Sequence, residues 1–267
     1  MLPGVYTATY KNGKTYYRSS LTFRDKHISL GSFSTERKAH QAYREGVALI
    51  SRDHITLANY TSHIRALSFE KAVSLLNFRD NCVYIKNPIY LYQNYFVYFL
   101  EPQLEYKFDI DDLFFYSSHK IIRRGGRLFV NEYGMQTGIL SRYGIRSYGV
   151  PGTDYRFANG DITDYRYQNI IVVNRFRGVS LVMRRGVPKY KAFIHINGNF
   201  SIGVYSTEEK AAIAYNKAVD LAKAAGINKN FQQNYLTELS GREYADIYTK
   251  LKISKKYMEY LGNLTSD

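Results

Sequence analysis

One block of the chain occurs twice. Residues 31–50 and 203–222 align without gaps at an offset of 172, and ten of the twenty aligned positions are identical. The similarity continues upstream, where residues 14–18 match residues 187–191. A repeat at this separation indicates two copies of one small domain, with a different segment between them.

Each copy has the pattern of three short antiparallel strands followed by one helix. An Asn-Gly pair at 12–13 is a strong hairpin signal in the first copy, and the same pair recurs at 197–198. Ser34 and Ser206 are the expected helix N-caps. The expected strands cover residues 5–11, 16–24 and 27–33 in the first copy, and 179–184, 190–196 and 200–205 in the second.

Strand alternation divides the side chains of each sheet between two faces. The apolar set should meet the helix, which leaves a polar and cationic set facing outward. A sheet face of this kind fits the major groove of DNA, which admits a β-ribbon. The outward candidates are Tyr6, Arg18, Ser20, Thr22, Arg24, His27 and Ser29 in the first copy, and Ser180, Arg184, Arg185, Lys191, Phe193, His195, Asn199 and Ser201 in the second.

Charge and composition narrow the class of partner. The 267 residues include 37 Lys and Arg against 23 Asp and Glu, a net charge of +14. A surplus of this size is typical of nucleic-acid-binding proteins, so double-stranded DNA is the expected partner. The single cysteine, Cys82, excludes a disulfide framework and is expected to be a buried thiol. No apolar stretch approaches about 18 residues and no signal-peptide pattern occurs, so we expect no membrane association and a cytoplasmic, nucleoid-associated protein.

The segment between the copies has a weaker pattern. Helices are expected at 68–77 and 135–144, a helix or a helical turn at 109–117, and strands in the Tyr- and Phe-rich stretch up to residue 99. A basic hairpin tip at 123–127 carries three arginines that could hold phosphates, Arg123, Arg124 and Arg127. After the second copy, a further helical pattern covers residues 237–262.

The repeated pattern resembles the Apetala-two/ethylene-response-factor DNA-binding domain over residues 3–60 and 177–235. The resemblance rests on Gly-Val, on Tyr-(Arg/Lys)-x-x-(Leu/Ile), and on the Ser-Thr-Glu-x-x-Ala-x-x-Ala-Tyr run. It implies two DNA-binding modules. Where that family has tryptophan this chain has Tyr17 and Tyr190, and the base-reading arginines of its first strand are absent, so the target sequence stays open. A sheet–helix module used for protein contacts is the alternative.

Residues 157–176 resemble the core of HNH homing endonucleases. The skeleton is Asn159-Gly160-Asp161, followed by Asp164, Arg166 and Asn169. That family places an aspartate and a histidine before it, at the two positions that precede Ala158 in this chain, to hold a metal and activate water. Here those positions carry Arg156 and Phe157, which can do neither. The resemblance therefore implies a core without catalytic residues, metal or cofactor, in which Arg156 and Arg166 hold DNA phosphates instead.

We accordingly expect an α+β chain with a degenerate, ββα-metal-like HNH centre between two units of three-stranded sheet and helix. The expected function is sequence-specific binding of double-stranded DNA by a non-enzymatic transcriptional regulator, derived from a homing endonuclease of a phage or mobile element. An active, metal-dependent HNH-type endonuclease is the alternative. The expected divisions are a first DNA-binding domain at 1–61, the central domain at 62–176, a second DNA-binding domain at 177–236 and a helical extension at 237–267.

Overall fold

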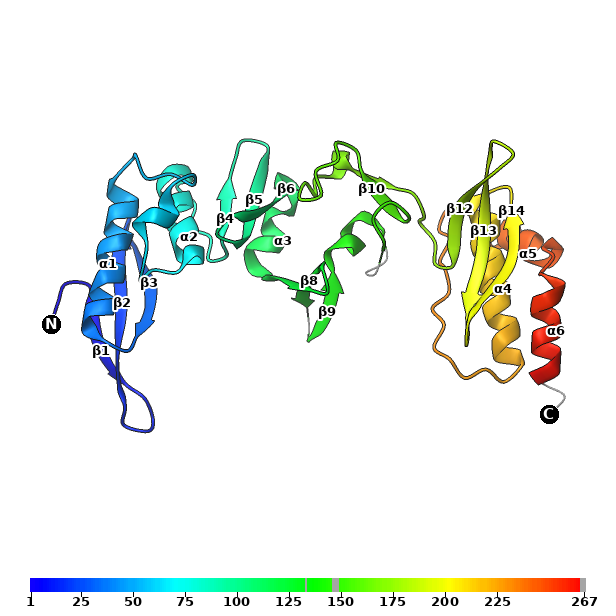
Figure 1. The fold of residues 1–267 in the computed structure, drawn as a ribbon, viewed down its shortest axis with the longest axis horizontal. Coiled ribbons are helices and arrows are strands. Elements are labelled where there is room, and N and C mark those ends of the chain that lie inside the picture. Colours follow the sequence, from blue (N-terminus) through cyan, green and yellow to red (C-terminus); the bar gives the residue numbers. More distant parts are fainter. Residues whose placement is uncertain (133, 146–148, 265–267) are drawn as a thin grey trace. The chain divides into compact units, whose positions relative to one another are not determined.

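A computed structural model describes residues 1–132, 134–145 and 149–264. Helices alternate with several small antiparallel sheets, which confirms the expected α+β class (Figure 1). The chain forms two compact units, the first made of residues 1–137 and 159–169 and the second of residues 138–158 and 170–267. The four-way division expected from the sequence stays a prediction.

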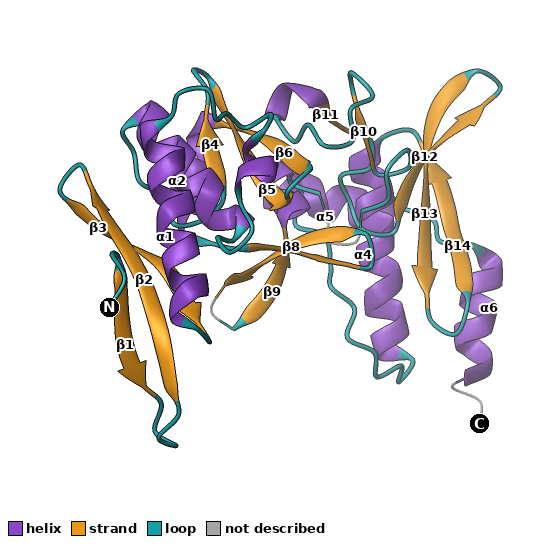
Figure 2. Ribbon diagram, turned by 60° about the vertical axis from the view of Figure 1, so that its left-hand side comes forward, coloured by secondary structure: helices purple, strands orange, loops and turns teal. Residues whose placement is uncertain are grey.

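The first unit begins with the sheet β1 (Val5–Thr9), β2 (Thr15–Phe23) and β3 (Lys26–Phe33), in that order. Helix α1 (Glu36–Ser51) covers one face of this sheet (Figure 2). Helix α2 (Phe69–Asn81) packs on α1, so one buried core runs through the sheet and both helices.

The rest of the first unit contains two more small sheets. The sheet contains β4 (Ile89–Leu91), β5 (Tyr95–Glu101) and β6 (Leu104–Asp109), and helix α3 (Leu113–Ser118) follows it. The next sheet has the order β7 (Ile121–Arg124), β8 (Arg127–Glu132) and β9 (Met135–Gly138). Short 3-10 helices of this unit lie at Tyr60–His63, Ile110–Asp112 and Tyr167–Asn169, and one of the second unit lies at Ile139–Tyr143.

The second unit repeats the sheet and helix of the first. Strands β12 (Val179–Arg184), β13 (Val187–His195) and β14 (Asn199–Tyr205) form the sheet, and helix α4 (Glu208–Ala224) covers it. Helices α5 (Gly241–Lys250) and α6 (Lys255–Leu264) follow, and buried Tyr257 of α6 donates a 2.8 Å hydrogen bond to the Ala218 carbonyl. A separate two-stranded ladder joins β10 (Tyr155–Phe157) to β11 (Ile170–Val172).

The two copies agree in details that the sequence repeat does not require. In each sheet the register shifts at one place, between Ser19 and Ser20 in β2 and between Ala192 and Phe193 in β13. Such a β-bulge bends the strand that carries it and increases the local twist. The agreement indicates one shared backbone design.

Each copy also uses a glycine at the entrance to its first strand. Gly4 and Gly178 have φ of +71° and +68°, and a Cβ on either would lie 2.0–2.2 Å from the ring of Tyr43 or Tyr215. Only glycine adopts this backbone conformation readily while leaving room for the ring.

Three local expectations were wrong. The helix N-caps are Thr35 and Thr207, one residue later than expected, because their extended backbone lets each hydroxyl accept a 3.3 Å bond from the amide three residues on. Residues 135–144 form strand β9 and a 3-10 helix instead of an α-helix, because β9 pairs with β8. Cys82 is exposed, since it ends α2 in a left-handed conformation.

Candidate nucleic-acid interface

Five of the expected outward residues of the first copy come together on the outer face of the sheet. They line a concavity of about 390 Å³ with Thr7, Ala8 and Ser19. Strand pairing sets this arrangement, because Tyr6 lies opposite Arg18 and Ser20 lies opposite Ser29. The five are Tyr6, Arg18, Ser20, His27 and Ser29.

The concavity offers both a cation and a hydroxyl to a ligand. The Arg18 side chain is exposed and forms no ion pair within the described part of the chain. Ser20 is 7% exposed, and its Oγ has no hydrogen-bond partner among the described residues. A buried hydroxyl without a partner costs about 1–3 kcal/mol, which a bound ligand or water would recover. Thr22, paired with His27 at the edge of this face, is exposed.

Arg24 has a different role from the one expected. It lies in the β2–β3 turn with φ of +48°, so it leaves the strand alternation that would have pointed it outward. Its guanidinium donates hydrogen bonds of 3.2 Å and 3.1 Å to the carbonyls of Phe78 and Arg79, at the end of α2. A cation there complements the negative end of the helix. Arg24 therefore ties the sheet to α2.

The outer face of the second sheet has the same register but different chemistry. Lys191 lies between Ser180 and Val204, in the place that Arg18 has in the first copy. Phe193 replaces Ser20 at the centre and lies opposite Ser201. The apolar ring fills the position at which the first copy has a partnerless hydroxyl. The chemistry therefore differs at the centre of the two faces.

The ends of this second face are polar. His195 Nδ1 lies 3.0 Å from Asn199 Oδ1, so these two side chains hold one another at the end of the ladder. Arg184 and Arg185 are exposed at the β12–β13 turn, where Arg185 has φ of +51°. These cations can reach a ligand without first breaking an ion pair within the described residues.

The nuclease-like skeleton builds a tight turn whose polar groups bond to each other. Asn169 Oδ1 accepts a 2.8 Å bond from the Asn159 amide, and its Nδ2 donates a 2.8 Å bond to the Asp164 carbonyl. Asp164, 1% exposed, also pairs with Arg166 at 2.7 Å. Burial raises the pKa of Asp164, but hydrogen bonds from Arg166 and its charge outweigh this and lower it.

The same turn is fastened to strand β6. The Lys107 amide donates to the Thr163 carbonyl, and Lys107 Nζ lies 3.0 Å from Asp161 Oδ2. Hydrogen bonds from Thr163, together with Lys107, lower the pKa of Asp161 to about 2. Arg166 lies over the Tyr95 ring, 5.2 Å from its centroid. Arg166 is therefore held by internal contacts rather than offered to a phosphate.

The positions that would carry nuclease chemistry hold no catalytic group. Arg156 is exposed, and Phe157 pairs through its backbone with Ile170. The expected ββα order does not occur here, since the chain runs from β11 to β12 without a helix. His119 is engaged elsewhere, with its Nδ1 2.8 Å from the Phe115 carbonyl. In the described ranges no group of three or more His, Cys, Asp or Glu could hold a metal ion.

The basic hairpin tip forms where the sequence predicts it, with Arg124 opposite Arg127 across the β7–β8 turn. Arg123 pairs with exposed Glu101 at 2.9 Å, and Arg124 donates a 3.0 Å bond to Gln136. Exposed pairs of this kind contribute only about 0–1 kcal/mol, so both arginines can exchange them for a phosphate.

Sequence reasoning missed a second group of cations, on helix α1. Arg37, Arg44 and Arg52 line one cavity of about 510 Å³ with Arg65 from the following loop. The spacing of seven residues puts Arg37 and Arg44 on one face of the helix, which periodicity alone could have found, whereas Arg52 follows the last helical residue in extended backbone.

Comparison with known proteins gives no relative for this chain. No protein-family model, no curated protein and no solved structure matches it. In the described part of the chain, no helix is long and apolar enough to cross a bilayer.

Proposed function

We propose that the chain binds double-stranded DNA through the outer faces of its two repeated sheets, and that it does so without cutting the DNA. The observation that carries the proposal is the equivalent placement of Arg18 and Lys191. Each lies on the middle strand of a three-stranded sheet whose other face is covered by a helix. A cationic, uncovered sheet face suits the major groove, and the net charge of +14 favours a polyanion.

The two faces should contribute differently to recognition. The first face has Arg18 beside the Ser20 hydroxyl, which has no hydrogen-bond partner among the described residues. Together these two side chains can hydrogen-bond to the edge of a base pair. The second offers Lys191 with Phe193, whose ring can meet a thymine methyl. Because the copies differ, the site need not be a palindrome, and joining two modules raises affinity through effective concentration.

The central turn supports binding rather than hydrolysis. A cation and a phenyl ring, Arg156 and Phe157, occupy the positions that the nuclease resemblance assigns to metal ligand and general base. A homing endonuclease that lost these catalytic groups but kept two DNA-binding sheet faces could still act as a regulator of transcription, and this is the function that we infer. The biological role rests on the resemblance.

Titration of labelled duplex DNA tests the proposal, with binding sites first selected from a random library. Removing the side chain of Arg18 or Lys191 by substitution with alanine should weaken the selected site by about 1–3 kcal/mol, and each should relax a different part of it. With about six phosphates neutralised, the log–log salt slope should be near −5.

Matched controls remove the same charge from the helix side. Lys38 on α1 and Lys223 on α4 are exposed, and replacing either with alanine should leave the affinity for the selected site nearly unchanged. Equal losses from the sheet and helix variants would show that charge alone, rather than the sheet face, determines binding. A flat salt response, or a preference for single strands, would contradict the proposal altogether.

A further inference from the structure

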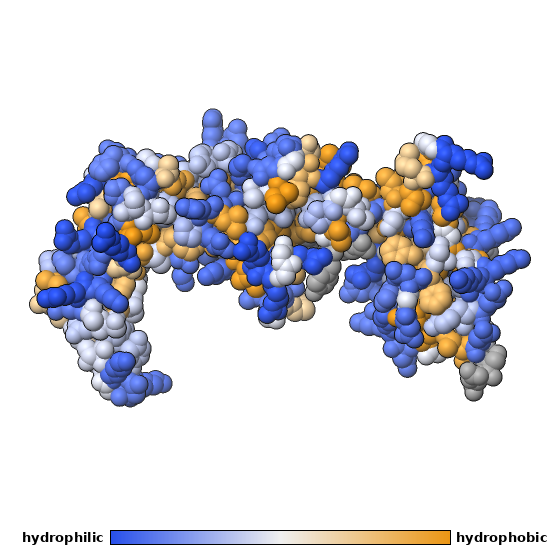
Figure 3. All heavy atoms as spheres, viewed as in Figure 1, coloured by the Kyte–Doolittle hydropathy of each residue, from blue (hydrophilic) through white to orange (hydrophobic). Residues whose placement is uncertain are grey.

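The exposed side of α1 forms a groove with an excess of cations. Its lining includes Arg37 and Arg44 of α1, Arg52 at the end of the helix and Arg65 of the following loop. Within the described ranges these four arginines form no ion pair. The one acid in the groove, Glu45, is already engaged, because its carboxylate accepts bonds of 2.8–3.3 Å from three successive backbone amides, residues 65–67. Figure 3 shows hydrophilic side chains gathered over α1.

The second copy shows what this helix face can hold. At the repeat offset of 172, Arg44 corresponds to Asn216 of α4. The Asn216 side chain grips the backbone of Asn234 from both sides, donating a 2.8 Å bond to its carbonyl and accepting a 2.7 Å bond from its amide. One helical turn further along, Asp220 accepts a 2.6 Å bond from Gln233. A peptide segment without helix or strand, residues 231–236, thus lies on the face of α4.

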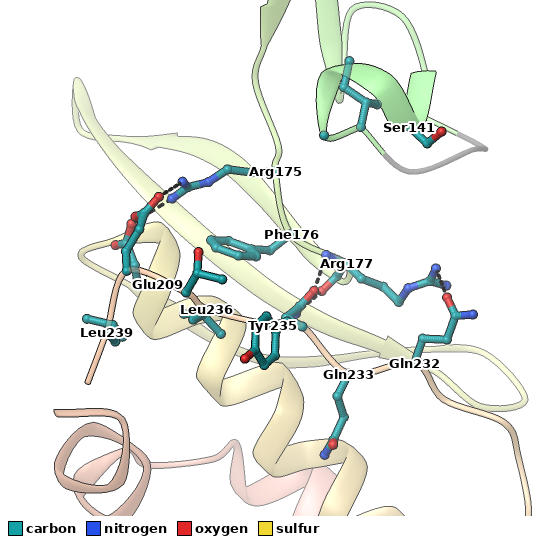
Figure 4. A pocket seen from close by; sticks show the side chains of 15 residues that line it. Ser141, Arg175, Phe176, Arg177, Glu209, Gln232, Gln233, Tyr235, Leu236 and Leu239 are labelled. Carbon is teal, nitrogen blue, oxygen red and sulfur yellow. Dashed lines mark hydrogen bonds and ion pairs between the residues drawn. The ribbon is translucent and has the colours of Figure 1, made fainter. Parts of the chain in front are cut away.

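Figure 4 shows how this segment is held at its other side. The Arg177 amide donates a 2.7 Å bond to Asn234 Oδ1, and its guanidinium bonds to Gln232. Glu209, which corresponds to Arg37, pairs with Arg175 at 3.2 Å. The segment therefore fits between α4 and the chain that enters β12.

In the first copy this helix face is open at Arg37 and Arg44, although Ser62, His63 and Arg65 of the following loop also line the groove, and Arg37 reverses the charge of its equivalent Glu209. Arg37 and Arg44 stand where the second copy has Glu209 and Asn216, and neither side chain has a hydrogen-bond partner in the part of the chain that the structure describes. From residue 37 to residue 52 a helix rises about 22 Å, enough for about seven residues of extended peptide.

We propose that the groove on α1 binds an acidic peptide segment of another protein. Carboxylates at alternate positions of such a peptide would meet the guanidinium groups, which bind carboxylates in a bidentate geometry. A duplex seated on the outer face of the β1–β3 sheet cannot reach this groove, because α1 covers the opposite face. The groove is thus a second surface, independent of the proposed DNA-binding function.

The probe is a labelled peptide whose sequence is based on the segment that lies on α4. The labelled heptapeptide has the sequence of residues 231–237 with the changes Gln232→Glu, Gln233→Glu and Asn234→Asp. The unchanged heptapeptide, which has no charged side chain, is the neutral control, and a third version carries lysine at these three positions. The full-length chain should bind the acidic peptide at least about tenfold more tightly than the neutral one at low salt, measured by fluorescence anisotropy.

Charge reversal in the protein distinguishes a binding role from a structural one. The variant Arg37→Glu with Arg44→Glu should lose the acidic peptide and prefer the lysine version. A variant of equal net charge, Lys11→Glu with Lys14→Glu in the exposed β1–β2 turn, should keep the preference for the acidic peptide.

Two results would overturn the proposal. One is an acidic peptide that binds no better than the neutral peptide, or that loses as much affinity with the turn variant as with the groove variant. The other is a groove variant that weakens the binding of duplex DNA as much as Arg18→Ala does, together with displacement of the bound peptide by the duplex. This result would show that the groove contacts DNA phosphates. Loss of DNA binding by Arg18→Ala with peptide binding intact would leave the two surfaces separate, as proposed.

Discussion

Replacing Gly4 with alanine tests the backbone design that the two copies share. The new Cβ would stand 2.0 Å from Cδ2 and 2.3 Å from Cγ of Tyr43, whose ring packs against the core of the first unit. A φ of +71° adds left-handed strain of about 1–2 kcal/mol. Displacing the ring costs about 1–3 kcal/mol. The reduced freedom of the unfolded chain returns about 0.4–1 kcal/mol. Taking the middle of each range, the net loss should be about 3 kcal/mol.

Gly13 gives the matched control, because its φ is +79° and a Cβ there would have nothing within 4 Å. Its replacement by alanine carries the strain without the clash, so it should cost about 1 kcal/mol or less. Gly178→Ala should destabilise the second unit at least as much as Gly4→Ala destabilises the first. Its Cβ would meet the Phe193 carbonyl oxygen at 2.5 Å as well as the Tyr215 ring at 2.2 Å.

Urea denaturation followed by a fluorophore on Cys82 would report the first unit alone, since this exposed thiol lies at the end of α2. With an m-value of about 2 kcal/mol/M, Gly4→Ala should lower the midpoint by about 1–2 M. In a Tyr43→Ala background the clash is gone, so the same glycine substitution should cost only the strain. Equal midpoints for Gly4→Ala and Gly13→Ala would refute the reasoning.

Three other results are expected. Glu45→Ala should destabilise the first unit by about 3 kcal/mol, read from the same urea midpoint, because three backbone amides lose their acceptor. Carbon-13 NMR should find the pKa of Asp161 at about 2, and Lys107→Met should raise it. Since that folded pKa is below the ordinary value of 3.8, the stability from Asp161 is complete above about pH 4 and is lost as the pH falls toward 2. Plasmid carrying a bound site should stay uncut with magnesium or manganese; nicking that a chelator abolishes would restore the endonuclease alternative.

The repeated sheets and helices could be predicted from the sequence because their signals are local. Strand alternation, Asn-Gly turns and a Ser-Thr-Glu helix start each act within a few residues, and the bounds of the expected strands agree with the structure to within three positions. The helix expected at 135–144 failed for the opposite reason. Pairing of β9 with β8 is a tertiary contact that overrides the local preference.

The candidate site could be predicted only where the alternation of the strands governs it. Arg18 and Ser20 lie on the outer face as expected, whereas Arg24 and Arg166 are diverted to other partners. For Arg24 these partners lie 54 and 55 residues away, at the end of α2, so no local sequence pattern near the turn predicts them. A count of arginines therefore overstates how many cations a surface offers.

One position of the repeated helix shows how the copies came to present different surfaces. Glu45 and Lys217 are equivalent at the offset of 172, yet the carboxylate accepts from the amides of residues 65–67, while the ammonium donates to the carbonyls of Tyr248 and Leu251. The two charges select opposite backbone groups, so each helix anchors a different following segment. On α4 the remaining face is covered by residues 231–236, and on α1 it stays open. The reversal of charge between Glu45 and Lys217 thus goes together with a covered face on α4 and an open, cationic face on α1.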